Sequence, residues 1–113
     1  MTDLLLTTWT DVCGLDDLSP GRGVAALVGG EQVAVFRWED DTVFAVSNYD
    51  PFSRAYVLSR GIVGSRGDAP KVSSPVYKQS FDLRTGACFD DATVHLTTFP
   101  TRLVGGRVEI GTP

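Results

Sequence analysis

The sequence predicts an all-β protein, an antiparallel β-sandwich or β-barrel, and three observations support this prediction. Short apolar runs recur along the 113 residues, and several alternate apolar and polar side chains with the period of a half-buried strand. Glycine pairs and acidic turns separate these runs every eight to twelve residues or so. No window of about 11 residues or more has the i, i+3, i+4, i+7 apolar spacing of an amphipathic helix.

The N-terminal half predicts a meander of short strands. A weakly alternating run ends at Gly14, and a turn with one short helical turn is expected before the Pro20-Gly21 breaker. The Gly29-Gly30 pair supplies positive φ at both central positions of a hairpin, so its two flanking strands should fold back on each other. The expected strands are residues 9–13, 24–28, 31–38 and 42–46, with a turn at 39–41.

The C-terminal segment repeats the hairpin pattern. The pair Gly105-Gly106 joins an expected strand at 98–104 to another at 107–110. Val108 and Ile110 alternate with charged neighbours, as in a half-buried antiparallel strand. A second hairpin is therefore expected at this end of the chain.

The middle of the chain, from residue 48 to about 86, has a different composition. Prolines and glycines interrupt its apolar runs, which indicates two long loops mounted on short strands rather than sheet core. Functional sites concentrate in loops that a rigid scaffold holds. We expect a single domain over residues 1–113, with a loop subdomain at about 48–86 that carries the function.

These two loops resemble the cluster-binding loops of the Rieske family. Rieske domains place Cys-x-His in one loop and Cys-x-x-His in a second, and these side chains hold a [2Fe–2S] cluster. Leu-Ser-x-Gly usually follows the first loop, and x-x-x-Phe-Asp-x-x-Thr-Gly follows the second motif. The corresponding segments here are Leu58-Ser59-Arg60-Gly61 and Phe81-Asp82-Leu83-Arg84-Thr85-Gly86. The resemblance covers nearly the whole chain and implies a Rieske-like fold whose loops form a degenerate cluster-binding subdomain.

The four ligand positions of that pattern hold other residues. Asp50 and Phe52 stand where the first cysteine and histidine would be, and Ser74 and Tyr77 stand where the second pair would be. Phenylalanine has no donor atom, and neutral serine and tyrosine hydroxyls are poor ligands for iron. The resemblance therefore implies that this chain holds no [2Fe–2S] cluster. We expect the rings of Phe52 and Tyr77 to approach each other across the former cluster position, because aromatic pairs fill such gaps well.

Residues 48–64 and 74–86 are similar to one group within the Rieske-like family, the small subunits of assimilatory NADH-dependent nitrite reductases. This resemblance implies a cytoplasmic, non-catalytic accessory chain of nitrate assimilation. The large subunit that it would bind carries FAD, an iron–sulfur cluster and sirohaem and reduces nitrite to ammonia. Two alternatives stay open at this point: a Rieske-type ferredoxin that carries electrons, and a stand-alone protein-binding module with the same fold.

Basic residues gather around the two loops although the chain is acidic. The net charge is −4, yet six of the 10 lysines and arginines lie between residues 54 and 84. Rieske carriers dock their redox partners through the cluster tip, and the resemblance implies that this surface survives as a docking face. We expect Arg54, Arg60 and Lys78 to pair with carboxylates of the large subunit.

Composition and motifs argue against other functions. A net charge of −4 disfavours nucleic acid and anionic membranes as partners, and no apolar run approaches the ~20 residues that cross a bilayer. Cys13 and Cys88 are expected as buried thiols, although a disulfide stays open, and His95 is expected at the surface or core edge. Gly21-Arg22-Gly23 lacks the following helix of a phosphate loop. No catalytic constellation supports an independent enzyme.

Overall fold

A computed structural model describes residues 7–113 as short β-strands with three 3₁₀ turns, and no α-helix occurs among these residues. The all-β prediction is therefore confirmed, and the described residues include no helix that could cross a membrane. The 3₁₀ turns are Leu15–Asp17, Glu39–Asp41 and Leu58–Arg60 (η4). The strands are β1 (Thr8–Gly14), β2 (Gly23–Val28), β3 (Glu31–Arg37), β4 (Val43–Ser47), β5 (Tyr49–Asp50), β6 (Ala55–Tyr56), β7 (Ile62–Arg66), β8 (Ala69–Ser73), β9 (Ser80–Asp82), β10 (Thr98–Phe99), β11 (Thr101–Val104) and β12 (Arg107–Thr112).

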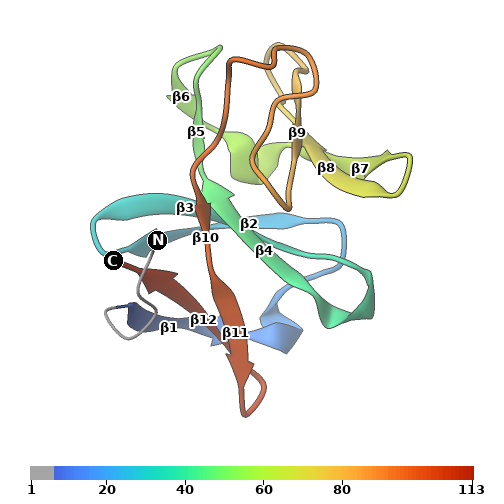
Figure 1. The fold of residues 1–113 in the computed structure, drawn as a ribbon. Coiled ribbons are helices and arrows are strands. Elements are labelled where there is room, and N and C mark those ends of the chain that lie inside the picture. Colours follow the sequence, from blue (N-terminus) through green and yellow to red (C-terminus); the bar gives the residue numbers. More distant parts are fainter. Residues whose placement is uncertain (1–6) are drawn as a thin grey trace.

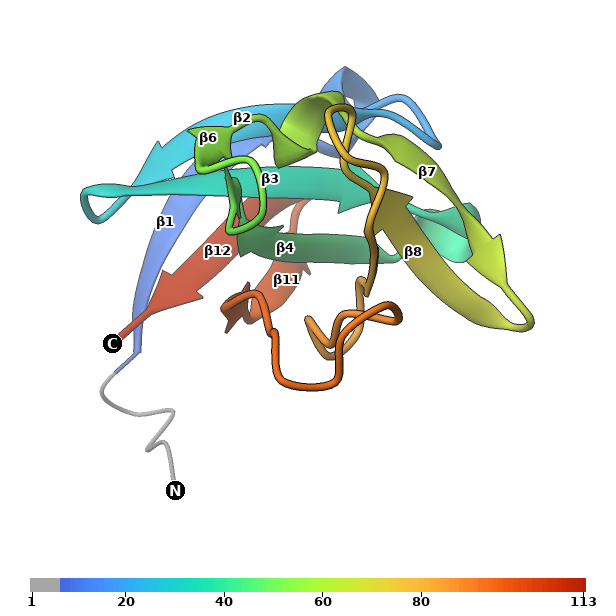
Figure 2. The same cartoon turned by 90° about the horizontal axis from the view of Figure 1, so that it is seen from above.

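Two antiparallel sheets form the lower half of the molecule as drawn in Figure 1. One has the strand order β1-β12-β11, and the other has the order β10-β4-β3-β2. The strands of the middle segment, β5 to β9, lie above them and form a two-stranded and a three-stranded sheet. Seen from above, the β7–β8 hairpin projects to one side of the central strands, and the C-terminus lies on the opposite side (Figure 2).

Both glycine-pair hairpins form as the sequence predicts. Gly29 and Gly30 have φ values of 57° and 82°, and Gly105 and Gly106 have φ values of 55° and 78°. Residues with positive φ at both central positions match the twist of the flanking strands, so each pair closes a tight hairpin. The register follows directly: Val28 pairs with Glu31, and Val104 pairs with Arg107.

Strand β3 lies between two hydrophobic cores, which explains its uninterrupted apolar run. Val33 and Val35 pack into a core with residues of β1, β2 and β12. Ala34 and Phe36 point to the other face and pack into a second core with residues of the middle segment. All four are fully buried. Side chains alternate between the two faces of a strand, so a strand that is covered on both faces needs apolar residues at every position.

The middle segment contains more sheet than the sequence predicts. Strands β7, β8 and β9 form an antiparallel sheet, and Leu58, Val72 and Phe81 from this segment are fully buried in the second core. The expectation of two loops without sheet core is therefore wrong. Gly64 and Pro70 lie within the paired strands, and Gly67, at a φ of 63°, forms the hairpin turn together with Asp68. The second core also includes Leu96, beyond the expected boundary near residue 86.

Candidate functional site

The two loops that the sequence singles out have the same backbone design. We call residues 50–54 the first loop and residues 74–78 the second loop; both lie at the top of Figure 1. Each begins with a polar residue and a proline and ends with a basic residue. The amide of the fifth residue donates to the carbonyl of the first, at 2.8 Å from Arg54 to Asp50 and 3.1 Å from Lys78 to Ser74. Arg54 and Lys78 both have positive φ, at 58° and 66°.

The side chain of each first residue also stabilises its own loop. Asp50 Oδ1 accepts a hydrogen bond from the amide of Phe52 at 3.0 Å. Ser74 Oγ accepts one from the amide of Val76 at 3.2 Å. Asp and Ser side chains commonly bond the amide two residues further on in this way. The two loops are thus matched turns, each with a small polar side chain at the position that the resemblance assigns to a Rieske cysteine.

These two polar side chains bond directly to each other and join the loops. Ser74 Oγ donates to Asp50 Oδ2 at 2.5 Å, and Ser53 Oγ donates to the same oxygen at 2.7 Å. Asp50 and Ser74 are both fully buried. A hydrogen bond to an ionised carboxylate is stronger than one between neutral groups. In this chain a buried hydrogen bond therefore connects the two loops at the point where a Rieske cluster would connect them.

The charge state of Asp50 depends on this network. Burial by itself raises the pKa of the Asp50 carboxyl, because it disfavours the charged form. Hydrogen bonds from the hydroxyls of Ser74 and Ser53 and from the backbone amides of Phe52 and Ser53 outweigh burial, so the net effect lowers the pKa. Asp50 is therefore an ionised carboxylate at neutral pH, held by several donors in a buried position.

The expected contact between Phe52 and Tyr77 is wrong. Phe52 packs against the second core, with its ring centroid 6.1 Å from that of Phe81 and the ring planes tilted by 46°. Tyr77 remains 62% exposed at the tip of the second loop. The Asp50–Ser74 bond already joins the loops, so no aromatic pair is needed to fill the space between them. The Phe52 ring is consequently part of the hydrophobic packing, and the Tyr77 ring is part of the surface.

Comparison with known families identifies the fold. The family model for the Rieske-like [2Fe–2S] domain matches residues 8–111. The chain belongs to the Rieske-like [2Fe–2S] domain family. This agrees with the twin loops and with the resemblance seen in the sequence.

Several individual relatives of this chain are nitrite reductase subunits. The chain is 43% identical to the nitrite reductase (NADH) small subunit of Salmonella typhimurium, over 93% of this chain and 98% of the relative. A Mycobacterium tuberculosis protein assigned as an NADH-dependent nitrite reductase small subunit has a crystal structure that matches with a TM-score of 0.93 and 47% identity, over 96% and 97% of the two chains. The chain is also 39% identical to a segment of the Klebsiella oxytoca nitrite reductase [NAD(P)H] large subunit, which covers 91% of this chain but 11% of that protein.

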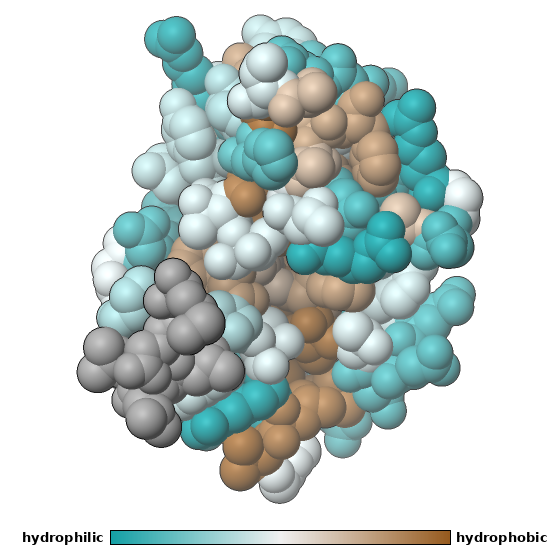
Figure 3. Space-filling model, viewed as in Figure 1, coloured by the Kyte–Doolittle hydropathy of each residue, from teal (hydrophilic) through white to brown (hydrophobic). Residues whose placement is uncertain are grey.

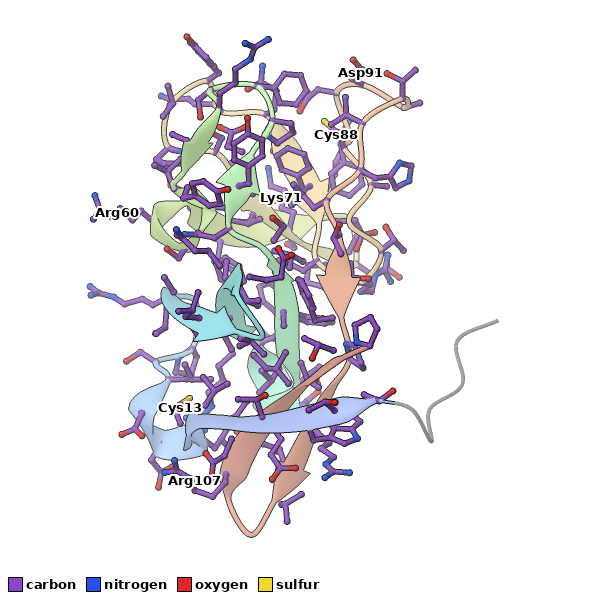
Figure 4. The ribbon with its side chains drawn as sticks, turned by 90° about the vertical axis from the view of Figure 1, so that its left-hand side faces the viewer. Cys13, Arg60, Lys71, Cys88, Asp91 and Arg107 are labelled. Carbon is purple, nitrogen blue, oxygen red and sulfur yellow. The ribbon has the colours of Figure 1, made fainter. Side chains whose placement is uncertain are left out.

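The residues at the Rieske ligand positions do not fit a [2Fe–2S] cluster. The side-chain oxygens of Asp50 and Ser74 already form hydrogen bonds within and between the loops, and the Phe52 side chain has no atom that could bind iron. Within residues 7–113 no group of three or more histidine, cysteine and acidic side chains is arranged to hold a metal. Cys13 and Cys88 are free thiols at opposite ends of the molecule, so neither can complete a ligand set with the other (Figure 4).

The three basic residues expected on one docking face lie in two places. Arg54 and Lys78 occupy equivalent positions, at the ends of the two loops that the Asp50–Ser74 bond joins. Arg60 belongs instead to η4 and lines a separate hollow together with Arg22. All four side chains are exposed. Sequence reasoning named Arg54, Lys78 and Arg60 but did not connect Arg22 with them, because residues 22 and 60 meet only in the folded chain.

A further hollow, over β4 and β10, has no catalytic constellation among its described lining residues. This apolar hollow of about 490 Å³ runs over β4 and β10 between the two halves of the molecule and is lined by Val43, Phe99 and Leu83 among others. It belongs to the brown surface near the middle of Figure 3. Its one charged lining residue, Arg84, is bonded to Asp82. With no nucleophile beside a general base in its lining, the hollow gives no support to an enzymatic site.

Proposed function

We propose that this chain is the non-catalytic small subunit of a cytoplasmic NADH-dependent nitrite reductase in nitrate assimilation. Its partner is the large subunit, which carries FAD, an iron–sulfur cluster and sirohaem and reduces nitrite to ammonia. The chain itself holds no [2Fe–2S] cluster and contributes a protein surface. The observation that carries this proposal is the identity to nitrite reductase small subunits over nearly their whole length.

The match inside the Klebsiella oxytoca large subunit supports the partnership. A domain like this one occurs there within the same polypeptide as the rest of that large subunit. Covalent linkage keeps two domains at a high effective concentration, which is useful when they work side by side. We therefore expect the domain described here to contact the remaining domains of the corresponding large subunit.

The tips of the two loops are the first surface that we assign to this interface. Val76 and Tyr77 are 48% and 62% exposed, and Arg54 and Lys78 flank them on the two loops. Tyrosine and arginine are frequent at the centres of protein interfaces. Arg54 and Lys78 also adopt a backbone conformation that costs a non-glycine residue about 1 kcal/mol or more. Such strain is typical of positions whose side chain serves function rather than stability.

Iron analysis tests the absence of a cluster. The purified chain, produced in cells that assemble iron–sulfur clusters, is expected to contain less than about one tenth of an iron atom per chain and no acid-labile sulfide, because its ligand positions lack thiolates and imidazoles. A cluster-binding Rieske ferredoxin produced in the same way is the control. Two irons and two sulfides per chain would refute the proposal and make this protein an electron carrier.

The double variant Arg54→Gly/Lys78→Gly tests the loop tips without disturbing their turns. Glycine adopts positive φ readily, so the free energy of unfolding should stay unchanged or rise by about 1 kcal/mol. Affinity for the large subunit, measured by surface plasmon resonance, should fall at least about tenfold. The control Arg102→Ala/Arg107→Ala removes two exposed basic residues at the other end of the molecule. If the wild type and the glycine variant bind the large subunit with equal affinity, the loop tips are not part of the interface.

A further inference from the structure

Four basic side chains form no ion pair, cation–π contact or hydrogen bond within residues 7–113, whereas every other lysine and arginine side chain forms at least one. Of the 10 lysines and arginines in the chain, Arg37, Arg84, Arg102 and Arg107 form ion pairs. Arg66 lies over the ring of Phe89, and Lys71 donates to Ser80. The remaining four are Arg22, Arg54, Arg60 and Lys78. Arg54 and Lys78 belong to the loop tips, which leaves Arg22 and Arg60 without an assigned role.

Arg22 and Arg60 face one hollow although 38 positions separate them in the sequence. The hollow measures about 340 Å³ and lies between the start of β2 and η4; no acidic residue contributes to its lining. Figure 4 shows Arg60 extending from η4 into solvent at the edge of the molecule. Among residues 7–113 no carboxylate forms an ion pair with either arginine. The lining consists of Gly21, Arg22, Gly23, Ser59, Arg60 and Gly61.

The floor of this hollow is built from closely packed backbone. A side chain at Gly23 would collide with the carbonyl of Ser59 and would lie 2.5 Å from the ring of Phe36. The two backbone segments can meet only because position 23 is glycine. Asn48, itself buried, accepts a hydrogen bond from the amide of Ser59 at 2.7 Å through its side-chain oxygen. The amide of Arg22 donates to the carbonyl of Ser19 at 3.1 Å. The two arginines are therefore mounted on fixed backbone.

We propose that this hollow receives a carboxylate side chain of the nitrite reductase large subunit, as a second docking point beside the loop tips. The inference rests on the proposed function. A guanidinium binds a carboxylate with two parallel hydrogen bonds, and both arginines contribute to the lining of this hollow. The small glycine and serine residues leave room for an incoming acidic side chain. The occupant is thus a glutamate or aspartate that projects from the surface of the partner.

A protein carboxylate suits this hollow better than a free small anion. Both arginines are exposed, and exposed ion pairs contribute little because water and salt screen them. A free anion would gain only that weak attraction. A partner that covers the hollow excludes water, which strengthens the same pair. The geometry therefore points to a charge pair that matters only in the complex.

The test measures binding of the complete chain to the purified large subunit by surface plasmon resonance at several salt concentrations. Arg22→Ala/Arg60→Ala is expected to weaken binding about 10- to 100-fold and to reduce its salt dependence. Arg102→Ala/Arg107→Ala makes the same change in net charge away from the hollow and should stay within about twofold of the wild type. Thermal unfolding of each variant shows whether the fold is intact.

Each outcome distinguishes the two proposals. If the wild type does not bind the large subunit, the proposed function fails. If the wild type binds and the Arg22→Ala/Arg60→Ala variant matches the Arg102→Ala/Arg107→Ala control, only the second docking point fails. A further experiment tests whether the hollow binds a free small anion. The wild type alone is titrated with sodium acetate, nitrite and phosphate, and binding is followed by the NMR shifts of the Gly23 and Gly61 amides. Saturable binding below about 1 mM that the double variant loses would assign the hollow to a small anion instead.

Discussion

Replacing Asp50 with alanine is expected to lower the free energy of unfolding by about 3 kcal/mol, as measured by urea denaturation. The change removes the acceptor for the hydroxyls of Ser53 and Ser74 and for the amide of Phe52. Each buried donor left without a partner costs about 1–3 kcal/mol, and hydrogen bonds to charged groups lie at the upper end. The loss also disconnects the two loops, so affinity for the large subunit should fall with stability.

Asp91 provides the matched control for this variant. Its carboxylate accepts hydrogen bonds from the amide and the hydroxyl of Thr93, at 2.9 and 2.6 Å, but in an exposed position. Water can replace it there, so Asp91→Ala should cost under about 1 kcal/mol. In a double-mutant cycle, Asp50→Ala and Ser74→Ala should couple by about 1–3 kcal/mol. Additive effects of these two substitutions would mean that the bond between the loops contributes nothing.

The Asp50 network also predicts a dependence of stability on pH. The pKa of the Asp50 carboxyl is lowered in the folded chain, so the unfolded chain binds this proton more readily. The stability that its ionised form contributes is therefore complete above the unfolded pKa of about 4 and is lost as the pH falls through the folded pKa. The difference in unfolding free energy between wild type and Asp50→Asn should shrink as the pH falls below about 5. A constant difference down to pH 3 would exclude Asp50 as the titrating group.

Local chemistry made much of the scaffold predictable from sequence. The pairs at 29–30 and 105–106 encode their hairpins through positive φ, which needs no knowledge of distant residues. Asp82 and Thr85 build the turn after the second loop, also as expected: Asp82 Oδ1 accepts from the amide of Arg84, and Thr85 Oγ1 accepts from the amide of Ala87. These features depend on residues within a few positions of one another.

Contacts between distant segments were harder to foresee. The sequence suggested an aromatic pair of Phe52 and Tyr77, whereas a polar pair joins the loops and Phe52 turns into the core. One signal could have indicated the polar pair: both loops start with a small polar residue followed by proline. No comparable signal exists for Arg22 and Arg60, because only the packing of Gly23 against Ser59 brings their segments together.

Gly86 is expected to tolerate substitution least among the glycines with positive φ, and Gly86→Ala should lower the unfolding free energy by about 3 kcal/mol. Residues 82–86 form the same turn as the two loops: the Gly86 amide donates to the carbonyl of Asp82 at 2.7 Å, and the fifth residue has a φ of 81°. A Cβ at this position would collide with the carbonyl oxygen of Leu96. The left-handed conformation costs alanine about 1 kcal/mol, and displacing the packed segment around Leu96 adds about 2 kcal/mol.

Gly106 separates the two causes, because its backbone conformation is nearly the same. Its φ is 78°, but a Cβ there would meet no atom within 4 Å. Gly106→Ala should therefore cost only about 1 kcal/mol, the conformational part alone. Leu96 belongs to the second core together with Phe81, so the extra cost at Gly86 measures how firmly the turn is held against that core. Equal losses for the two variants in thermal and urea unfolding would mean that conformation alone requires glycine at residue 86, and that its close approach to Leu96 carries no weight.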